Sequence, residues 1–212
     1  MAEHLRAELV ALPADLVVAE VAERIIDRLG ADLVSSRART LAALRAESYL
    51  RLVTDLRVLV TAPYEGDARR PARDVLPPLA RRAGRRLARE VTALEAAEAG
   101  PERDRRYHEA RKQAKRVRYA AEALIPLLGD DAVALVAFAE QAQNLLGEHQ
   151  DAIVVSGLLR RWASEVAAEP DGDPLTYGVL LGVQLGRLRV AERDFAALWT
   201  RMCQSPQRRW LR

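Results

Sequence analysis

Apolar residues recur at intervals of three and four along almost the whole chain, and this spacing limits the fold more than any other feature. A period near 3.6 residues is typical of amphipathic α-helices, and the alternation expected of strands is scarce. Prolines and glycines fall between the periodic segments and mark the expected connections. The pattern predicts helices over residues 2–12, 17–29, 31–62, 72–98, 102–128, 131–168 and 174–202.

We therefore expect an all-α fold in which long antiparallel helices form bundles with short connections. Gly30 predicts a break between two helices, and the sequence GEHQD predicts a bend near Gly147. Asp131 and Asp173 fit helix N-caps or first-turn acids, and Pro101 fits a first helical turn. The C-terminal sequence QSPQRRWLR either frays or docks through its tryptophan and the following leucine.

Composition adds a few limits to this picture. Half of the 212 residues are hydrophobic, so the chain can bury a core, and the polar loop over residues 63–71 predicts a subdomain boundary. We expect no membrane span, because no run of 18 uncharged apolar residues occurs, and no export, because a signal pattern is lacking. The lone Cys203 fits a reducing cytoplasm. Abundant arginine and alanine indicate a GC-rich, bacterial genome.

The net charge of +3 is distributed unevenly along the sequence. Residues 107–119, YHEARKQAKRVRY, hold five lysines and arginines against one acid, and residues 79–91 hold five arginines against one acid. Each segment carries +4, so subtracting their combined +8 from +3 leaves −5 on the rest of the chain. Two such clusters create a local field that can hold an anion, although a solvated helix face is the simpler reading of either one alone.

Placed on a helix, the segment over residues 107–119 separates into an apolar and a basic side. The apolar side, continued toward the C-terminus, consists of Ala110, Ala114, Val117, Ala121, Leu124 and Leu128. The opposite side holds His108, Arg111, Lys112, Lys115 and Tyr119, flanked by Arg116 and Arg118. Glu122 is expected to pair with Arg118, and Glu109 to lie off the basic row. The row is then short of negative charge, which fits a bound anion.

The preceding segment divides in the same way. Its expected apolar side consists of Leu76, Leu79, Ala83, Leu87, Val91 and Leu94, and its basic side of Arg81, Arg82, Arg85, Arg86 and Arg89. If the two helices pack side by side, up to ten cations line one groove. Arginine grips two phosphate oxygens at once and lysine adds a mobile charge, so a linear array of both matches a linear polyanion.

The segments HEARKQAKRVRYAAEAL and QNLLGEHQDA resemble the C-terminal half of a CHAD domain, the conserved histidine α-helical domain. The second repeat of that family has a His-x-x-Arg-Lys-x-x-Lys-Arg-x-Arg-Tyr helix, followed by a Leu-Gln-x-x-Leu-Gly-x-x-x-Asp sequence. The matching residues of the second motif are Leu146, Gly147 and Asp151. The segments RPARDVLPPLARRAGRRL and TYGVLLGVQLGR resemble the inter-repeat region and the closing helix of the family.

The resemblance implies two related bundles that enclose a basic cavity for inorganic polyphosphate. We expect no metal or cofactor, because few carboxylates converge. Residues 1–66 would be a remnant of the first repeat and residues 67–212 the second, together one CHAD-like domain. No His-and-Arg helix precedes AEHLRAELVALP, so we expect one basic wall to be absent and a partner chain to supply cover. The candidate binding residues are His108, Arg111, Lys112, Lys115, Arg116, Arg118, Tyr119, Arg81, Arg82, Arg85, Arg86, Arg89 and His149, of which His149 either lines the cavity or satisfies a backbone carbonyl at a helix break.

The sequence is also compatible with other functions. A basic groove also suits a nucleic-acid backbone, although few aromatic residues that stack on bases lie nearby. The family often occurs beside a CYTH triphosphatase-like domain, so an accessory role to such an enzyme is a further alternative. We do not expect catalysis, because the basic helices carry no acidic cluster for metals. The expected partners are polyphosphate or phosphate and sulfate anions, a CYTH-domain protein and a second copy of the chain, in the cytoplasm and at polyphosphate granules.

Overall fold

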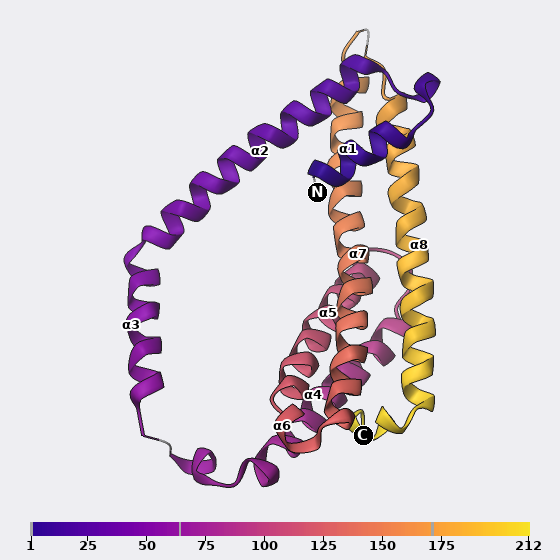
Figure 1. Ribbon diagram of the computed structural model, residues 1–212. Coiled ribbons are helices and arrows are strands. Elements are labelled where there is room, and N and C mark those ends of the chain that lie inside the picture. Colours follow the sequence, from indigo (N-terminus) through magenta and orange to yellow (C-terminus); the bar gives the residue numbers. More distant parts are fainter. Residues whose placement is uncertain (1, 64, 171) are drawn as a thin grey trace. The chain divides into compact units, whose positions relative to one another are not determined.

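The computed structural model describes residues 2–63, 65–170 and 172–212, which are almost entirely helical (Figure 1). The α-helices are α1 (Ala2–Ala11), α2 (Ala19–Arg45), α3 (Glu47–Thr61), α4 (Ala72–Glu95), α5 (Pro101–Glu122), α6 (Ile125–Leu128), α7 (Asp130–Ala167) and α8 (Leu175–Gln204). Three short 3-10 helices are η1 (Ala14–Leu16), η2 (Gly66–Arg69) and η3 (Pro206–Trp210). No strand occurs in the described ranges, and the expected all-α fold is confirmed. Within the predicted 63–71 loop, Tyr64 lies outside the described residues.

Several helix ends follow the expected local chemistry. The backbone N–H of Leu175 donates to Oδ1 of Asp173 at 2.8 Å, which caps the start of α8. Pro101 lies in the first turn of α5, and Asp131 lies in the first turn of α7, where acids interact favourably with the helix dipole. In the part of the chain that the structure describes, none of the helices has the length and apolarity that crossing a membrane requires.

The expected break at Gly30 was wrong. Helix α2 continues through Gly30, since a glycine inside a helix costs only about 1 kcal/mol and the buried Ile25 and Leu29 just before it hold the helix in place. Helix α7 is one continuous helix, as predicted over residues 131–168, and the expected bend near Gly147 stays a prediction. The chain instead leaves the helical conformation at Ala46, whose backbone is extended with φ −66° and ψ 147°. Neither proline nor glycine marks that position.

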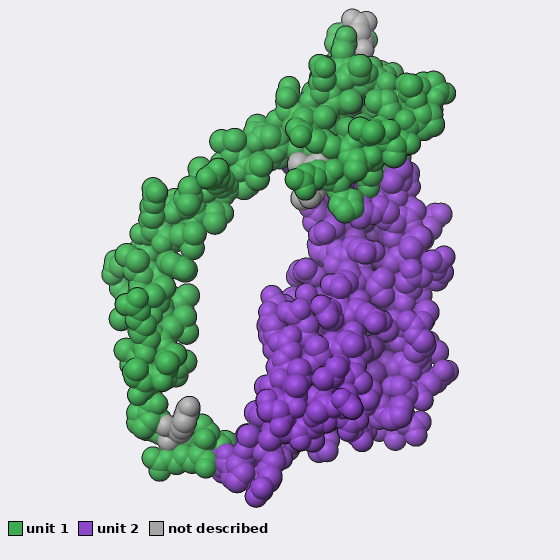
Figure 2. Space-filling model, in the orientation of Figure 1, with its two compact units in different colours: residues 1–69, 162–180 green, residues 70–161, 181–212 purple. Residues whose placement is uncertain are grey.

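The chain divides into two compact units, shown in separate colours in Figure 2. Unit 1 comprises residues 1–69 and 162–180, and unit 2 comprises residues 70–161 and 181–212. Helices α7 and α8 therefore contribute residues to both units. The assignment of residues 1–66 and 67–212 to two repeats of a family stays a prediction.

Unit 1 is held together by α1, the first part of α2, the end of α7 and the start of α8. The backbone N–H of Val18 donates to Oγ1 of Thr176 at 2.9 Å. Near the surface, Arg24 pairs with Glu169 at 3.0 Å, and a similar pair forms one turn further along α2. The buried apolar side chains of this unit include Leu5, Leu9, Val21, Ile25, Leu29, Trp162, Val166, Tyr177 and Leu180.

Unit 2 contains α4, α5 and the adjoining parts of α7 and α8, which lie side by side (Figure 1). Alanines of α5 and α7 are fully buried and allow these helices to approach closely. The predicted apolar side of α5 is confirmed except for Leu128, which falls in α6 and is exposed. On α4, Leu79 is also exposed because it lies about 100° from the centre of the packed side. Ala80 and Gly84 face the core in its place.

The C-terminal segment docks on α4 rather than fraying. Trp210 is buried, and its backbone carbonyl approaches Gly84 so closely that a Cβ atom there would overlap it. Nη1 of Arg85 donates to the carbonyl oxygen of Arg212 at 3.0 Å. The guanidinium of Arg81 lies 5.7 Å from the centre of the indole ring, a cation–π contact. Gly84 is therefore required for the tail to reach α4.

Replacing Gly84 with alanine is expected to destabilise the chain by about 1–3 kcal/mol, because the tail backbone must move away from the added methyl group. Gly186→Ala on α8 is a matched control, since no atom lies within 4 Å of its Cβ position. The control is expected to be neutral or stabilised by up to about 1 kcal/mol, as for any glycine inside a helix. Urea unfolding measures both variants, and equal effects at the two positions would contradict the close contact.

Candidate anion-binding site

The exposed sides of α4 and α5 meet in a shallow pocket of about 360 Å³. Arg86, Arg89 and Glu90 come from α4, and Gln113 and Arg116 come from α5. The helices place these side chains together because α4 and α5 pack against each other along their length. The pocket thus joins three cations to one acid, drawn from both basic segments of the sequence.

Neighbouring side chains fix the charge balance of this pocket. Nη1 of Arg116 donates to the buried Gln113 amide oxygen at 3.1 Å, which holds the guanidinium beside the pocket. The carboxylate of Glu90 forms an ion pair with Arg106, whose Nη1 lies 3.5 Å from Oε2. Arg86, Arg89 and Arg116 have no carboxylate oxygen within 4.0 Å in residues 2–63, 65–170 and 172–212. Positive charge is therefore in excess.

The basic row of α5 continues from Arg116 toward the N-terminus of the helix. Nζ of Lys112 lies 2.8 Å from Oε1 of Glu109, so the expectation that this acid lies off the row was wrong. An i,i+3 spacing puts the two residues on neighbouring positions of the helix surface. The hydrogen bond from Lys112 lowers the pKa of Glu109. Lys115 is exposed and has no such acid among the described residues.

Tyr119 lies between two cations at the far end of this row. Its ring centre is 5.7 Å from Nζ of Lys115 and 5.1 Å from the guanidinium carbon of Arg118. Half of the tyrosine is exposed. The predicted pair between Arg118 and Glu122 is confirmed, with Nε 3.4 Å from Oε1. Tyr119 thus presents a ring to solvent within a cationic environment.

Other candidate residues point away from the pocket. Nδ1 of His108 donates to Oε1 of Gln150 on α7 at 3.1 Å. Arg111 is half-buried alongside Gly147 of α7, with its Nε 3.5 Å from the position of a Cβ there. On α4, Arg81 and Arg85 contact the C-terminal segment. The pocket therefore gathers three of the ten cations that the sequence aligned along one groove.

His149 lies in the core, 1% exposed, and does not reach the basic surface. Its ring stacks on Tyr107 with centres 4.0 Å apart, and Nε2 lies 3.4 Å from Oε1 of Glu192. Burial lowers the pKa of His149 to about 4, so the ring is neutral near pH 7. The alternative that it satisfies a backbone carbonyl at a helix break is not met, because α7 is continuous and neither ring nitrogen has a hydrogen-bond partner among the described residues.

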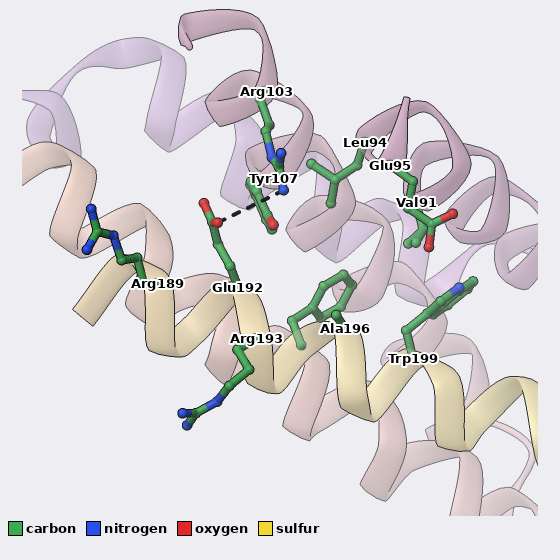
Figure 3. A pocket seen from close by; sticks show the side chains of 11 residues that line it. Val91, Leu94, Glu95, Arg103, Tyr107, Arg189, Glu192, Arg193, Ala196 and Trp199 are labelled. Carbon is green, nitrogen blue, oxygen red and sulfur yellow. Dashed lines mark ion pairs between the residues drawn. The ribbon is translucent and has the colours of Figure 1, made fainter. Parts of the chain in front are cut away.

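Tyr107 and Glu192, which contact His149, also line a separate pocket of about 360 Å³. Figure 3 shows the residues that line this pocket. Arg103 of α5 and Glu192 of α8 line it and form an ion pair at 4.0 Å, marked by the dashed line in Figure 3. Apolar side chains make up much of the remaining wall, including Val91, Leu94, Phe195, Ala196 and Trp199. Its lining also holds Glu95, Arg189 and Arg193, so three arginines face two acids. Because this excess of positive charge is smaller and its wall is largely apolar, the pocket is less suited to a polyanion than the pocket between α4 and α5.

The sequence did not indicate several of these residues. Gln113 stands three positions before Arg116, so helical spacing alone could have linked the two. Gln150 and Glu192 contact α5 only through tertiary packing, and no local pattern signals them. Within the described residues, no three histidine, cysteine, aspartate or glutamate side chains gather in a way that could hold a metal ion.

A family model described as the CHAD domain matches residues 1–160, which include α4, α5 and most of α7. The chain belongs to the CHAD family. Two curated relatives are the uncharacterized proteins MT2285 and Rv2226 of Mycobacterium tuberculosis, from strains CDC 1551 / Oshkosh and ATCC 25618 / H37Rv. Each is 33% identical to this CHAD chain over 181 residues, which is 85% of the chain and 34% of the relative. The chain therefore spans about a third of their length. No solved structure gives a significant match.

Proposed function

We propose that this CHAD chain binds inorganic polyphosphate on a basic surface formed by Arg86, Arg89, Lys112, Lys115 and Arg116. The observation that carries this proposal is the pocket that three guanidinium groups from α4 and α5 line, none of which has a carboxylate oxygen within 4.0 Å among the described residues. Membership of the CHAD family is compatible with this ligand.

A linear polyanion fits this surface better than a single phosphate does. Residues 112 and 116 of α5 are separated by about 6 Å along the helix axis at 1.5 Å per residue, and the pocket with Arg86 and Arg89 lies beside them. A single phosphate would contact the pocket alone, whereas a chain of phosphates contacts the pocket and the lysines together. Arginine forks bind paired phosphate oxygens, and the lysine amines contribute point charges.

The proposed function is binding without catalysis. Glu90 is the one carboxylate in the pocket lining, and Arg106 lies at its oxygen, so it is poorly placed to act as a base. In this proposal, a CYTH-domain partner supplies any triphosphatase chemistry, and the chain acts in the cytoplasm where it meets polyphosphate granules. The half-exposed ring of Tyr119 between two cations favours one alternative, a nucleic-acid strand whose bases stack on it.

The affinity for polyphosphate is expected to fall about 100-fold between 50 and 200 mM salt, if about five phosphates are neutralised with a slope of about −0.7 each. Calorimetric titration at the two salt concentrations measures the change. A dissociation constant that is independent of salt would contradict the proposal. Displacement of polyphosphate by duplex DNA at equal phosphate concentration would favour the nucleic-acid alternative instead.

A further inference from the structure

The second half of α2 and all of α3 form a helical arm, residues 31–62, with almost no buried side chains. Eleven large apolar side chains between residues 33 and 60 are 40–84% exposed. Single exposed leucines are ordinary on a protein surface, but a contiguous group of this size marks an interaction site. The question is what covers the arm.

Helix α3 has one mainly apolar side, although Leu50 and Val58 are exposed elsewhere on the helix. Six uncharged residues share one side at the 3-4 spacing of a coiled-coil seam, namely Tyr49, Leu52, Val53, Leu56, Leu59 and Val60. A shallow hollow of about 430 Å³ lies on this side, with Leu56 and Val60 in its lining. On the other side, Arg51 pairs with Glu47 at 2.6 Å and the hydroxyl of Thr54 donates to a backbone carbonyl. Apart from Val58, the opposite side is therefore polar and partly paired within the helix, whereas the apolar side is uncovered.

The exposed apolar area matches one half of a stable protein interface. A fully buried aliphatic side chain is worth about 1.5–3 kcal/mol at about 25 cal/mol per Å², or roughly 60–120 Å². Leu50 and Val58 lie off the apolar side of α3, and on that scale the other nine side chains, at the exposures above, present roughly 300–600 Å². A standard interface buries about 800 Å² per partner, of which about 65% is apolar in homodimers. Each chain therefore offers what a dimer requires.

The length of α3 is a second sign that a partner completes it. At 15 residues it is close to the minimum for a helix that is stable in water without tertiary packing. Val53 is the only side chain of residues 47–61 that is even partly buried, so the chain itself supplies little packing. Packing of the apolar side against another helix would provide the missing stability.

We propose that the apolar side of α3, extended by the exposed apolar residues of α2, is the interface of a homodimer. Two copies related by a two-fold axis present the same seam to each other, and leucines and valines interdigitate across it. The six seam residues carry no charge, and Arg57 is the one charged residue that lines the hollow beside them. A regularly spaced apolar seam of this kind is complementary to itself. This inference is independent of the proposed polyphosphate binding.

Sedimentation equilibrium of the full chain tests the proposal. The expected mass at 100 µM is about 47 kDa, twice the 23.5 kDa of one chain. Dilution is expected to shift the mass toward 23.5 kDa and to lower the helical content, as α3 loses its partner. A wild-type chain that stays monomeric at 100 µM would overturn the proposal and mean that a different partner covers the arm. This measurement needs no variant, so it decides the point even if a substituted chain fails to fold.

A pair of matched variants locates the interface. Leu56→Asp puts a charge into the centre of the seam and is expected to weaken the dimer at least 10-fold, since an unpaired charge would be buried. Thr54→Asp adds the same charge to the polar side of the same helix and is expected to leave the dimer unchanged. If the two variants dimerise equally, α3 is not part of the dimer interface.

Discussion

Reversing the charge of both Lys112 and Lys115 is expected to weaken polyphosphate binding by about 100-fold or more at 50 mM salt. A hydrogen bond from a charged group is worth about 1.5–3 kcal/mol, so the loss of two gives this factor before any new repulsion is counted. Both lysines are exposed on α5, and Lys112 pairs only with Glu109 among the described residues. The substitutions Lys112→Glu and Lys115→Glu therefore leave the core of unit 2 intact.

A control with the same change in net charge separates this effect from general electrostatics. Arg161→Glu with Arg201→Glu changes two exposed arginines of α7 and α8 that have no ion pair in the described part of the chain. Neutralising both lysines, by Lys112→Gln and Lys115→Gln, is expected to make the slope of log affinity against log salt concentration shallower by about 1.4, at about 0.7 per lost phosphate contact. Titrations that show equal weakening for the control and the lysine reversal would contradict the assignment of the basic surface.

The buried His149 is expected to cost the chain about 3 kcal/mol of folding free energy as the pH falls from 7 to 4. Its folded-state pKa of about 4 lies below the ordinary value of 6.5, and each pH unit of difference corresponds to about 1.4 kcal/mol. Between these values the unfolded chain binds a proton that the folded chain does not. Stability is therefore complete above pH 6.5 and is lost as the pH falls toward 4.

Neighbouring groups determine how this loss is isolated. Burial raises the pKa of Asp104, which takes up its proton more readily in the folded chain and so opposes the effect of His149 at low pH. The ring also faces Glu192 and Arg103. Comparing wild type with His149→Gln by urea unfolding at several pH values removes these common contributions. Parallel curves for the two chains across pH 4–7 would show that the histidine is not the cause.

Periodicity predicted the helices well because packing in an all-α unit depends on one apolar side of each helix. On α5, Ala110, Ala114 and Val117 are buried as their spacing indicates. The interruptions were less predictable. The sequence around Gly30 suggests a break, but a single glycine destabilises a helix only mildly. The sequence around Ala46 contains no glycine or proline, and yet the helix ends there. Which of the two positions interrupts the helix depends on how well the neighbouring segment is packed.

The candidate site was predictable in its residue types but not in their directions. The pair between Arg118 and Glu122 depends on one helix alone, and spacing predicts it. The direction of Arg81 depends on Trp210, more than a hundred residues away, and that of His108 depends on Gln150 of another helix. The local sequence does not identify those neighbours. Cations that form one row on an isolated helix therefore contact several different neighbours once the helices pack.

The chain has only two lysines, and both belong to the exposed side of α5. Acetylation of side-chain amines, which removes the positive charge, can therefore change this protein at a single location. The thirty-one arginines, including those of the same surface, are untouched by such a modification. Amine-reactive labelling of side chains, read by mass spectrometry, likewise becomes a footprint of this one surface.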